Sequence, residues 1–229
     1  DEWFDPMLHL PRSGNLDEVI ETNKLVRDNK ALIAKCRIIV ITLGLIECIL
    51  DKKTGRYLNS ITPDMIQSKN YARYEIHVME LSEVLSSLEE IYDLLAGNLA
   101  SDFKIILSVS PVQLKNTFRD MDVITANMYS KSLLRTAAEI FSSNHTNIDY
   151  LPIYESVMMS ERKYTWEADL IHVSDFIIKL NIQRALNLYT NGKISGEVNN
   201  NQLIADSIDE ELIAELPKQL RTTRNCHLH

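Results

Sequence analysis

The chain has 229 residues, 45% of them hydrophobic, and its 24 basic and 32 acidic residues give a formal net charge of -8 at pH 7. This length and apolar content are sufficient for one large globular domain with a buried core. An acidic balance without a basic stripe argues against a nucleic-acid partner, because backbone recognition relies on clustered Lys and Arg. The longest apolar run, at residues 38–50, is too short to cross a bilayer, so we expect no membrane partner.

The cysteines indicate a reducing environment. Cys36, Cys48 and Cys226 form an odd set without the spacing of a metal site. Two of them flank an apolar run, where a reduced cysteine behaves as a small hydrophobic side chain. We therefore expect a cytoplasmic location, no bound metal and no cofactor.

The first third of the chain predicts a loop, a helix and a strand. The first 15 residues contain two prolines and predict a surface loop. Apolar residues then recur at helical spacing from Leu16, which predicts a helix ending near Lys35. Residues 37–44, RIIVITLG, are a β-branched run without polar alternation. Such a run predicts a strand buried on both faces, as in a parallel sheet.

The next segments predict a polar loop, a helix and a second strand. Residues 51–71 are polar and contain a turn and Pro63, so they predict a loop that passes over the strand ends. Residues 74–95 alternate apolar and acidic side chains at helical spacing, which predicts an amphipathic helix. Residues 103–110 predict a second buried strand, which Pro111 ends.

The remaining elements follow the same alternation. Residues 126–141 predict a helix and residues 148–152 a short third strand. A last helix is predicted at 174–189, with Ser174 as its N-cap. We assign residues 1–190 to one α/β domain and residues 191–229 to a linker, a short helix and a flexible tail.

Strands that alternate with helices of this length predict a parallel α/β sheet with right-handed crossovers. In such sheets the ligand lies at the carboxyl ends of the strands. Loops that can reach this edge carry polar residues or a glycine, and we predict substrate-binding roles for Gly44, Glu47, Ser110, Tyr154 and Glu155.

Asp169 and His172 form the most suggestive pair, three residues apart on the loop before the last predicted helix. A carboxylate that holds one imidazole nitrogen fixes the tautomer and stabilises the imidazolium, so the pair can act as a general base. The alternative is that Asp169 caps a turn and His172 is a partly buried polar residue, because isolated Asp and His pairs are mostly structural.

Serines at the end of the second strand are weaker candidates for a nucleophile. Ser108 and Ser110 end the strand at the same edge of the sheet, but no glycine flanks either one to give a sharp nucleophile turn. The preferred interpretation is that their hydroxyls satisfy backbone groups at the strand end. Gly44 is a lone glycine without a following Gly-x-Gly-x-x-Gly, so no dinucleotide site is predicted.

Six segments can be compared with known families: VITLGLIE (40–47), DKKTGRYLN (51–59), SPVQLKNT (110–117), TANMYSKSLLR (125–135), DYLPIYE (149–155) and DLIH (169–172). In this order and spacing they resemble the GSCFA domain family, which is similar to the SGNH (GDSL-like) hydrolases. The resemblance spans about residues 3–188 and implies a three-layer α/β/α flavodoxin-like fold with esterase or acyl-transfer chemistry. It matches Asp169 and His172 to the Asp-x-x-His block that supplies two members of the triad.

Two departures from the family pattern bear on this expectation. The Gly-Ser-Cys-Phe-Ala motif, whose serine would be the nucleophile, is absent, and we expect the chain to be a fragment or truncated relative lacking about 60 residues. SGNH hydrolases have Gly-x-Asn-Asp where this chain has Gly44-Leu45-Ile46-Glu47, and Ile46 has no side-chain donor for an oxyanion. Loss of such a donor typically costs ~10²–10³ in rate.

The resemblance therefore implies a serine esterase or O-acyltransferase that acts on an acylated carbohydrate or another small ester, with His172 as base and Asp169 as its orienting group. The alternative is a non-catalytic binding or structural domain with a degenerate SGNH-like site, which the absent serine and Ile46 favour. A missing neighbouring strand would leave residues 37–43 at a sheet edge. We therefore expect the isolated chain to self-associate there, to be poorly soluble, or to depend on a further segment.

Overall fold

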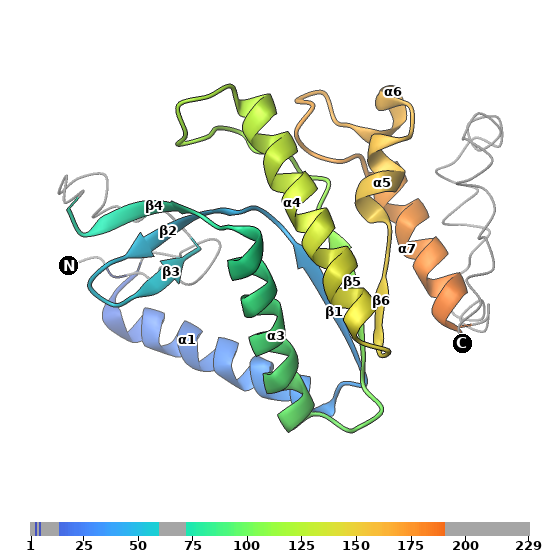
Figure 1. The fold of residues 1–229 in the computed structure, drawn as a ribbon. Helices are drawn as coiled ribbons and strands as arrows, with labels where there is room; N and C mark the ends of the chain where they lie inside the picture. The colour runs from blue at the N-terminus through green and yellow to red at the C-terminus, as the bar shows by residue number, and fades with distance from the viewer. Residues whose placement is uncertain (1–2, 4, 6–13, 60–71, 191–229) are drawn as a thin grey trace. The chain divides into compact units, whose positions relative to one another are not determined.

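Figure 1 shows a computed structural model of the chain, in which residues 3, 5, 14–59 and 72–190 are described. These residues form a mixed α/β protein with two compact units. Unit 1 comprises Asp1–Leu107 and Asn116–Tyr150, and unit 2 comprises Ser108–Lys115 and Leu151–His229. The predicted tail at 191–229 lies outside the described residues. None of the described helices has the length and apolar character needed to cross a membrane.

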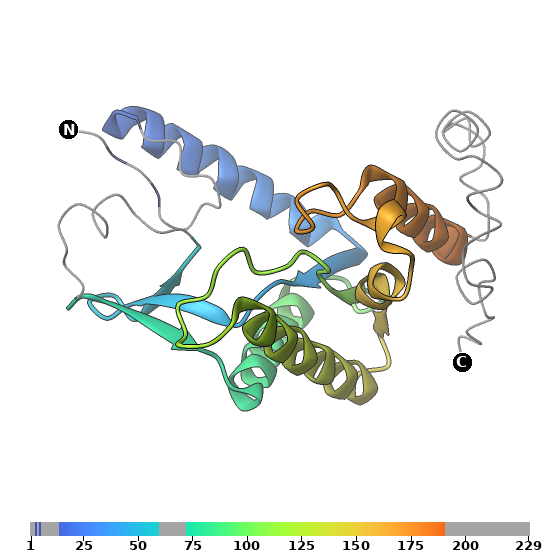
Figure 2. The ribbon, with the colours of Figure 1, turned by 90° about the horizontal axis from the view of Figure 1, so that it is seen from above.

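Unit 1 begins with the predicted helix. Helix α1 (Leu16–Lys30) starts with a capping box, in which the Asn15 side chain accepts from the Glu18 backbone and the Glu18 carboxylate accepts from the Asn15 backbone. A 3₁₀ helix, η1 (Ala31–Lys35), continues it. Figure 2 shows the two as one continuous helical segment that leads toward β1. The prediction of a helix ending near Lys35 is confirmed.

The parallel sheet consists of β1 (Ile38–Leu43), β5 (Lys104–Val109) and β6 (Ile148–Tyr150), in the order β1-β5-β6. Strands β5 and β6 pair in parallel, with Ile105 opposite Ile148 and Leu107 opposite Tyr150. All residues of β5 after Lys104 are buried. The predicted second and third strands are therefore confirmed, and β5 is the buried centre of the sheet.

Strand β1 differs from its prediction. It lies at one edge among the described strands, and Ile38 and Val40 are 49% and 63% exposed. The prediction of burial on both faces is wrong, because exposure alternates along β1 and one of its faces is uncovered. An unbroken apolar run cannot show this, since its sequence lacks the polar alternation of a half-exposed strand. Pairing of two chains through this edge stays a prediction.

Two helices pack beside the sheet. Helix α3 (Leu81–Asn98) and helix α4 (Val123–Asn144) contact each other, and α4 also contacts β6 (Figure 1). Asp122 is the N-cap of α4, and its side chain accepts from the backbone amides of Ile124 and Thr125. The helix predicted at 126–141 is thus confirmed and extends further at both ends.

A second, antiparallel sheet was not predicted. Its strands β2 (Glu47–Asp51), β3 (Arg56–Leu58) and β4 (Tyr74–Val78) are arranged in the order β3-β2-β4. Glu47 therefore begins a strand instead of lying on a loop. The polar loop predicted at residues 51–71 begins with the hairpin of β2 and β3. The helix predicted from residue 74 begins only at Leu81, because residues 74–78 satisfy their backbone groups by pairing with β2, Ile49 opposite Ile76.

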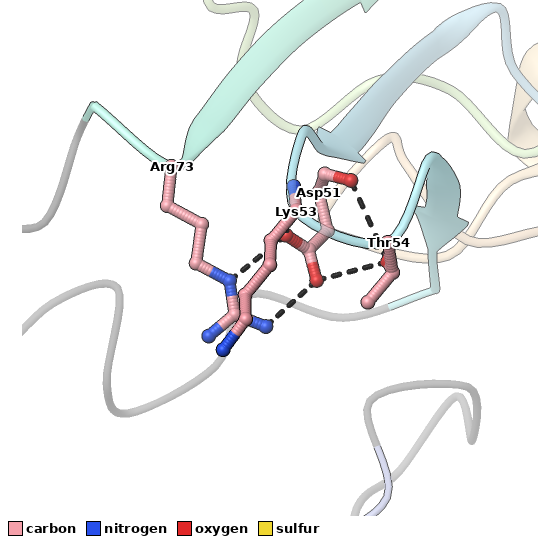
Figure 3. Close-up of polar contacts among 4 residues, drawn as sticks. All are labelled: Asp51, Lys53, Thr54 and Arg73. Carbon is pink, nitrogen blue, oxygen red and sulfur yellow. Dashed lines mark hydrogen bonds and ion pairs between the residues drawn. The ribbon is translucent and has the colours of Figure 1, made fainter.

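Asp51 anchors this hairpin. Its side chain is 4% exposed, and both oxygens accept hydrogen bonds from the Arg73 guanidinium, at 2.8 and 2.7 Å (Figure 3). The backbone of Lys53 and the hydroxyl of Thr54 donate to the same carboxylate, each at 3.0 Å. Hydrogen bonding by Arg73 holds the pKa of Asp51 well below its usual range. The carboxylate thus fixes the turn after β2 to the start of β4.

Unit 2 contains α5 (Ile153–Met158), α6 (Arg162–Thr165) and α7 (Asp175–Thr190). Its core consists of Val157, Trp166 and Ile177. The buried Ser156 hydroxyl donates to the Asn181 side chain at 2.8 Å and ties α5 to α7. The predicted last helix is confirmed, whereas α5 and α6 were missed because helices this short show no clear periodicity.

We predict that Asp51→Asn lowers the melting temperature at neutral pH, because it removes the charge that Arg73 holds in a buried position. An aspartate in the unfolded chain has a pKa of about 3.9. Because folding lowers the pKa of Asp51, the stabilisation is fully present at pH values above 3.9 and decreases as the pH falls below it. Thermal unfolding from pH 7 to pH 3 measures the difference. The matched control is Glu75→Gln, whose pair with Lys52 is exposed and spans 4.0 Å. Equal effects of the two substitutions would contradict the prediction.

Candidate active site

The loop between α6 and α7 is closed at its base. Trp166 and Val173 form an antiparallel bridge, and the Ser174 backbone donates to the Thr165 carbonyl at 2.9 Å. The Trp166 side chain is buried in the core of unit 2. The Ser174 hydroxyl lies 3.5 Å from the Ile177 amide, as expected for an N-cap of α7. The tip of the loop, residues 167–172, therefore projects from a fixed base.

The Asp169 carboxylate is held at this tip by hydrogen bonds to both oxygens. Oδ1 accepts from the Ile171 and His172 amides, each at 2.9 Å, and Oδ2 lies 2.5 Å from Nδ1 of His172. The hydrogen bonds from the backbone and then the side chain of His172, followed by that from Ile171, lower the pKa of Asp169 to about 2. The carboxylate is therefore ionised at neutral pH.

This pairing determines which nitrogen of His172 can accept a proton. An ionised carboxylate only accepts hydrogen bonds, so Nδ1 must carry the proton that it donates to Asp169. In the neutral ring the lone pair is then on Nε2. The structural alternative holds in part: Asp169 does cap the turn through the Ile171 and His172 amides, whereas the His172 side chain is 69% exposed and not partly buried. The arrangement can perform general-base chemistry at Nε2.

Leu170 lies between the two residues in a strained conformation. Its φ of 57° makes it the only non-glycine residue with positive φ in the described part of the chain. This conformation costs a side chain roughly 1–2 kcal/mol. Because the Asp169 carboxylate accepts from the amides of Ile171 and His172, the left-handed residue is part of the geometry that forms the pair. Such strain is concentrated at functional sites.

The other predicted site residues of unit 2 lie at the end of β5 and on α5. The Ser110 hydroxyl accepts from the Val112 amide at 3.3 Å, which agrees with its preferred role at the strand end. Ser108 is completely buried. Tyr154 and Glu155 lie on α5 and not on a loop, and burial, then the charge of Glu155, raises the pKa of Tyr154.

In unit 1, Gly44 follows β1 and Glu47 opens β2. Both carboxylate oxygens of Glu47 are engaged, one with the Thr117 hydroxyl at 2.6 Å and the other with the Phe118 amide at 3.1 Å. Glu47 therefore holds the loop between β5 and α4. The predicted convergence of Gly44 and Glu47 with the residues of unit 2 stays a prediction.

Sequence reasoning missed Lys131, which is completely buried on α4. Its Nζ donates to the Gly44 carbonyl at 2.8 Å, and burial lowers its pKa to about 8. The sequence does contain a signal, because Lys131 lies three residues before the buried Leu134 and so falls on the apolar face of the predicted helix. In the described ranges, no group of His, Cys, Asp and Glu side chains is arranged to hold a metal ion.

Comparison with known proteins gives one match. The GSCFA family model matches residues 3–184, which include most of the residues described in both units. No curated protein and no solved structure shows significant similarity to the chain.

We predict that Leu170→Gly stabilises unit 2 by about 0.5–1 kcal/mol relative to Leu170→Ala, because only glycine adopts the left-handed conformation without strain. The Leu170 side chain is 53% exposed, so both variants lose little packing. Urea unfolding of the two variants measures the difference. An alanine variant as stable as the glycine variant would show that the loop is not strained.

Proposed function

This chain belongs to the GSCFA family. We propose that it is part of a serine esterase or O-acyltransferase that acts on an acylated carbohydrate or another small ester. His172 is the general base and Asp169 orients it. We further propose that the mixed α/β protein has the three-layer flavodoxin-like fold of SGNH hydrolases. The observation that supports the proposal is the preformed contact of 2.5 Å between Asp169 Oδ2 and His172 Nδ1.

The proposed reaction uses Nε2 of His172 twice. In the first step Nε2 takes the proton of a serine hydroxyl while the serine oxygen attacks the acyl carbon of the ester. The Asp169 carboxylate stabilises the imidazolium that forms. The same nitrogen then gives the proton to the departing alkoxide, which leaves an acyl-enzyme. Attack by water completes hydrolysis, and attack by another alcohol completes acyl transfer. The family's nucleophilic serine is not among the 229 residues, so the proposal assigns the base and its partner only.

Ile46 favours a second candidate function, a non-catalytic binding or structural domain. Its side chain is completely buried, and its amide faces the Ser130 hydroxyl at 3.3 Å. Neither group is arranged as a side-chain oxyanion donor of the kind that asparagine provides in SGNH hydrolases. A fluorophosphonate probe separates the two candidates, because it labels only an activated serine. Absence of labelling of the natural full-length protein would favour the binding domain.

We also propose a cytoplasmic location. Cys36 and Cys48 are free thiols in the described part of the chain. Burial and the charge of Glu83 raise the pKa of Cys48, which keeps it in the less reactive thiol form. Free thiols of this kind are typical of a reducing compartment.

We predict that His172→Ala abolishes hydrolysis of a short-chain aryl ester by the natural full-length protein. Asp169→Asn should lower kcat by ~10³–10⁴, because the amide no longer selects the required tautomer. The matched control is His77→Ala, which removes a histidine paired with Glu83 at 2.8 Å in unit 1. Ester hydrolysis that survives His172→Ala as well as it survives His77→Ala would reject the assignment.

A further inference from the structure

Helix α7 carries apolar side chains on two opposite faces. Its inner face contributes Ile177 to the core of unit 2, and Leu180 packs against that core. Its outer face carries a line of apolar residues spaced four apart, which we call the outer stripe: Ile178, Ile182 and Leu186. Ile178 and Ile182 are 42% and 55% exposed. A surface helix normally has one apolar stripe, so this second stripe is suited to packing against a further element.

The sequence after α7 predicts one more short helix. Residues 191–229 lie outside the described residues, so only their sequence bears on this point. Ser207 and Glu210 have the spacing of a capping box, which predicts that a helix begins at residue 208. Pro217 cannot continue a helix, so the predicted helix ends at residue 216.

The predicted helix matches the outer stripe in spacing and in length. Its apolar residues also lie four apart, at Ile208, Leu212 and Leu216. Each line of three covers two helical turns, about 12 Å at a rise of roughly 1.5 Å per residue. A helix of this size is not stable alone in water, so it needs an apolar surface on which to fold. The outer stripe provides such a surface within the same chain.

The segment between the two helices can reach back along α7. Residues 191–207 include Gly192, Gly196 and three consecutive asparagines, a composition typical of a flexible linker. A flexible chain of about 17 residues has an end-to-end distance of roughly 20–25 Å. The way back from Thr190 to Ile178 along the helix is about 18 Å. Because the two helices are joined, their effective concentration is on the order of millimolar, so even a weak contact is populated.

The charges beside the two stripes are complementary. Lys179 is exposed and directly follows Ile178 on α7. In the predicted helix Glu215 directly precedes Leu216. If the helices run antiparallel, Leu216 lies beside Ile178, and the carboxylate of Glu215 then lies on the same side as the ammonium of Lys179. An antiparallel arrangement therefore adds a favourable charge pair at the edge of the apolar contact.

We propose that residues 208–216 fold back as a helix onto the outer stripe of α7 and lie antiparallel to it. The core of unit 2 then holds α7 from the inner side and the C-terminal segment holds it from the outer side. The contact stabilises the helix that follows the loop of Asp169 and His172. The inference concerns α7 and a segment of the same chain, and it does not require the acyl chemistry proposed for His172.

Hydrogen exchange of the 229-residue chain tests this contact. The amides of residues 208–216 should exchange at least tenfold more slowly than those of a free peptide of the same sequence. Leu212→Asp places a charge in the apolar line and should remove this protection. The matched control is Ala214→Asp, which places the same charge on the opposite face of the predicted helix and should keep most of it. Equal loss in the two variants, or no protection in wild type, would overturn the proposal.

A substitution on α7 identifies the surface that binds the segment. Ile182→Asp should also remove the protection of residues 208–216, although it changes no residue of that segment. The matched control is Ile20→Asp, at an exposed isoleucine of α1. Protection that survives Ile182→Asp would mean that the segment packs elsewhere. Protection that increases with protein concentration would mean that it packs on a second copy, and either result contradicts the proposal.

Methyl NMR of wild type tests the contact without any substitution. In protein with labelled isoleucine and leucine methyl groups, nuclear Overhauser effects should join Ile182 to Leu212 and Ile178 to Leu216. Contacts between Ile178 and Ile208 instead would show a parallel arrangement and contradict the proposed orientation. Absence of any such effect between α7 and residues 208–216 would contradict the contact itself.

Discussion

The Asp169 carboxylate accepts three hydrogen bonds, one from Ile171 and two from His172, and the geometry of this loop depends on that arrangement. The two amides fix Oδ1, which leaves Oδ2 directed at Nδ1 of His172. A left-handed Leu170 makes this turn possible, at a conformational cost that the bridge at Trp166 and the core of unit 2 offset. The contact between the two side chains is therefore formed by the loop itself, although His172 is 69% and Asp169 44% exposed.

Buried polar groups in unit 1 fall into two kinds. Asp51 is fully used: Arg73, Lys53 and Thr54 satisfy its oxygens, and its role is to hold a hairpin. Lys131 is buried to a similar extent but makes one hydrogen bond within the described residues. The Asp51 carboxylate keeps its charge because its partners stabilise it, whereas burial without such partners lowers the pKa of Lys131. The partners of each group, and not burial alone, therefore determine how its pKa departs from the ordinary value.

The sequence predicted the parts of the fold that depend on strong local patterns. The apolar run of β5 and the long periodic stretch of α4 are clear, and Asp169 and His172 were found because their spacing alone brings them together in a turn. Strand β4 was missed because its five residues directly precede a helix and share its apolar pattern. The exposure of β1 and the burial of Lys131 depend on which elements cover them, and tertiary contacts of this kind leave only weak traces in one sequence.

Asp169 Oδ2 faces Nδ1 of His172, and this contact should fix the tautomer of the imidazole in the free protein. Long-range ¹H–¹⁵N correlation NMR of the ring nitrogens at neutral pH measures this directly, without a substrate or a nucleophile. In the neutral form of the ring we expect the proton on Nδ1 and the lone pair on Nε2, and a loss of that preference in Asp169→Asn. A wild-type ring protonated at Nε2, or an equal mixture of the two tautomers, would contradict it.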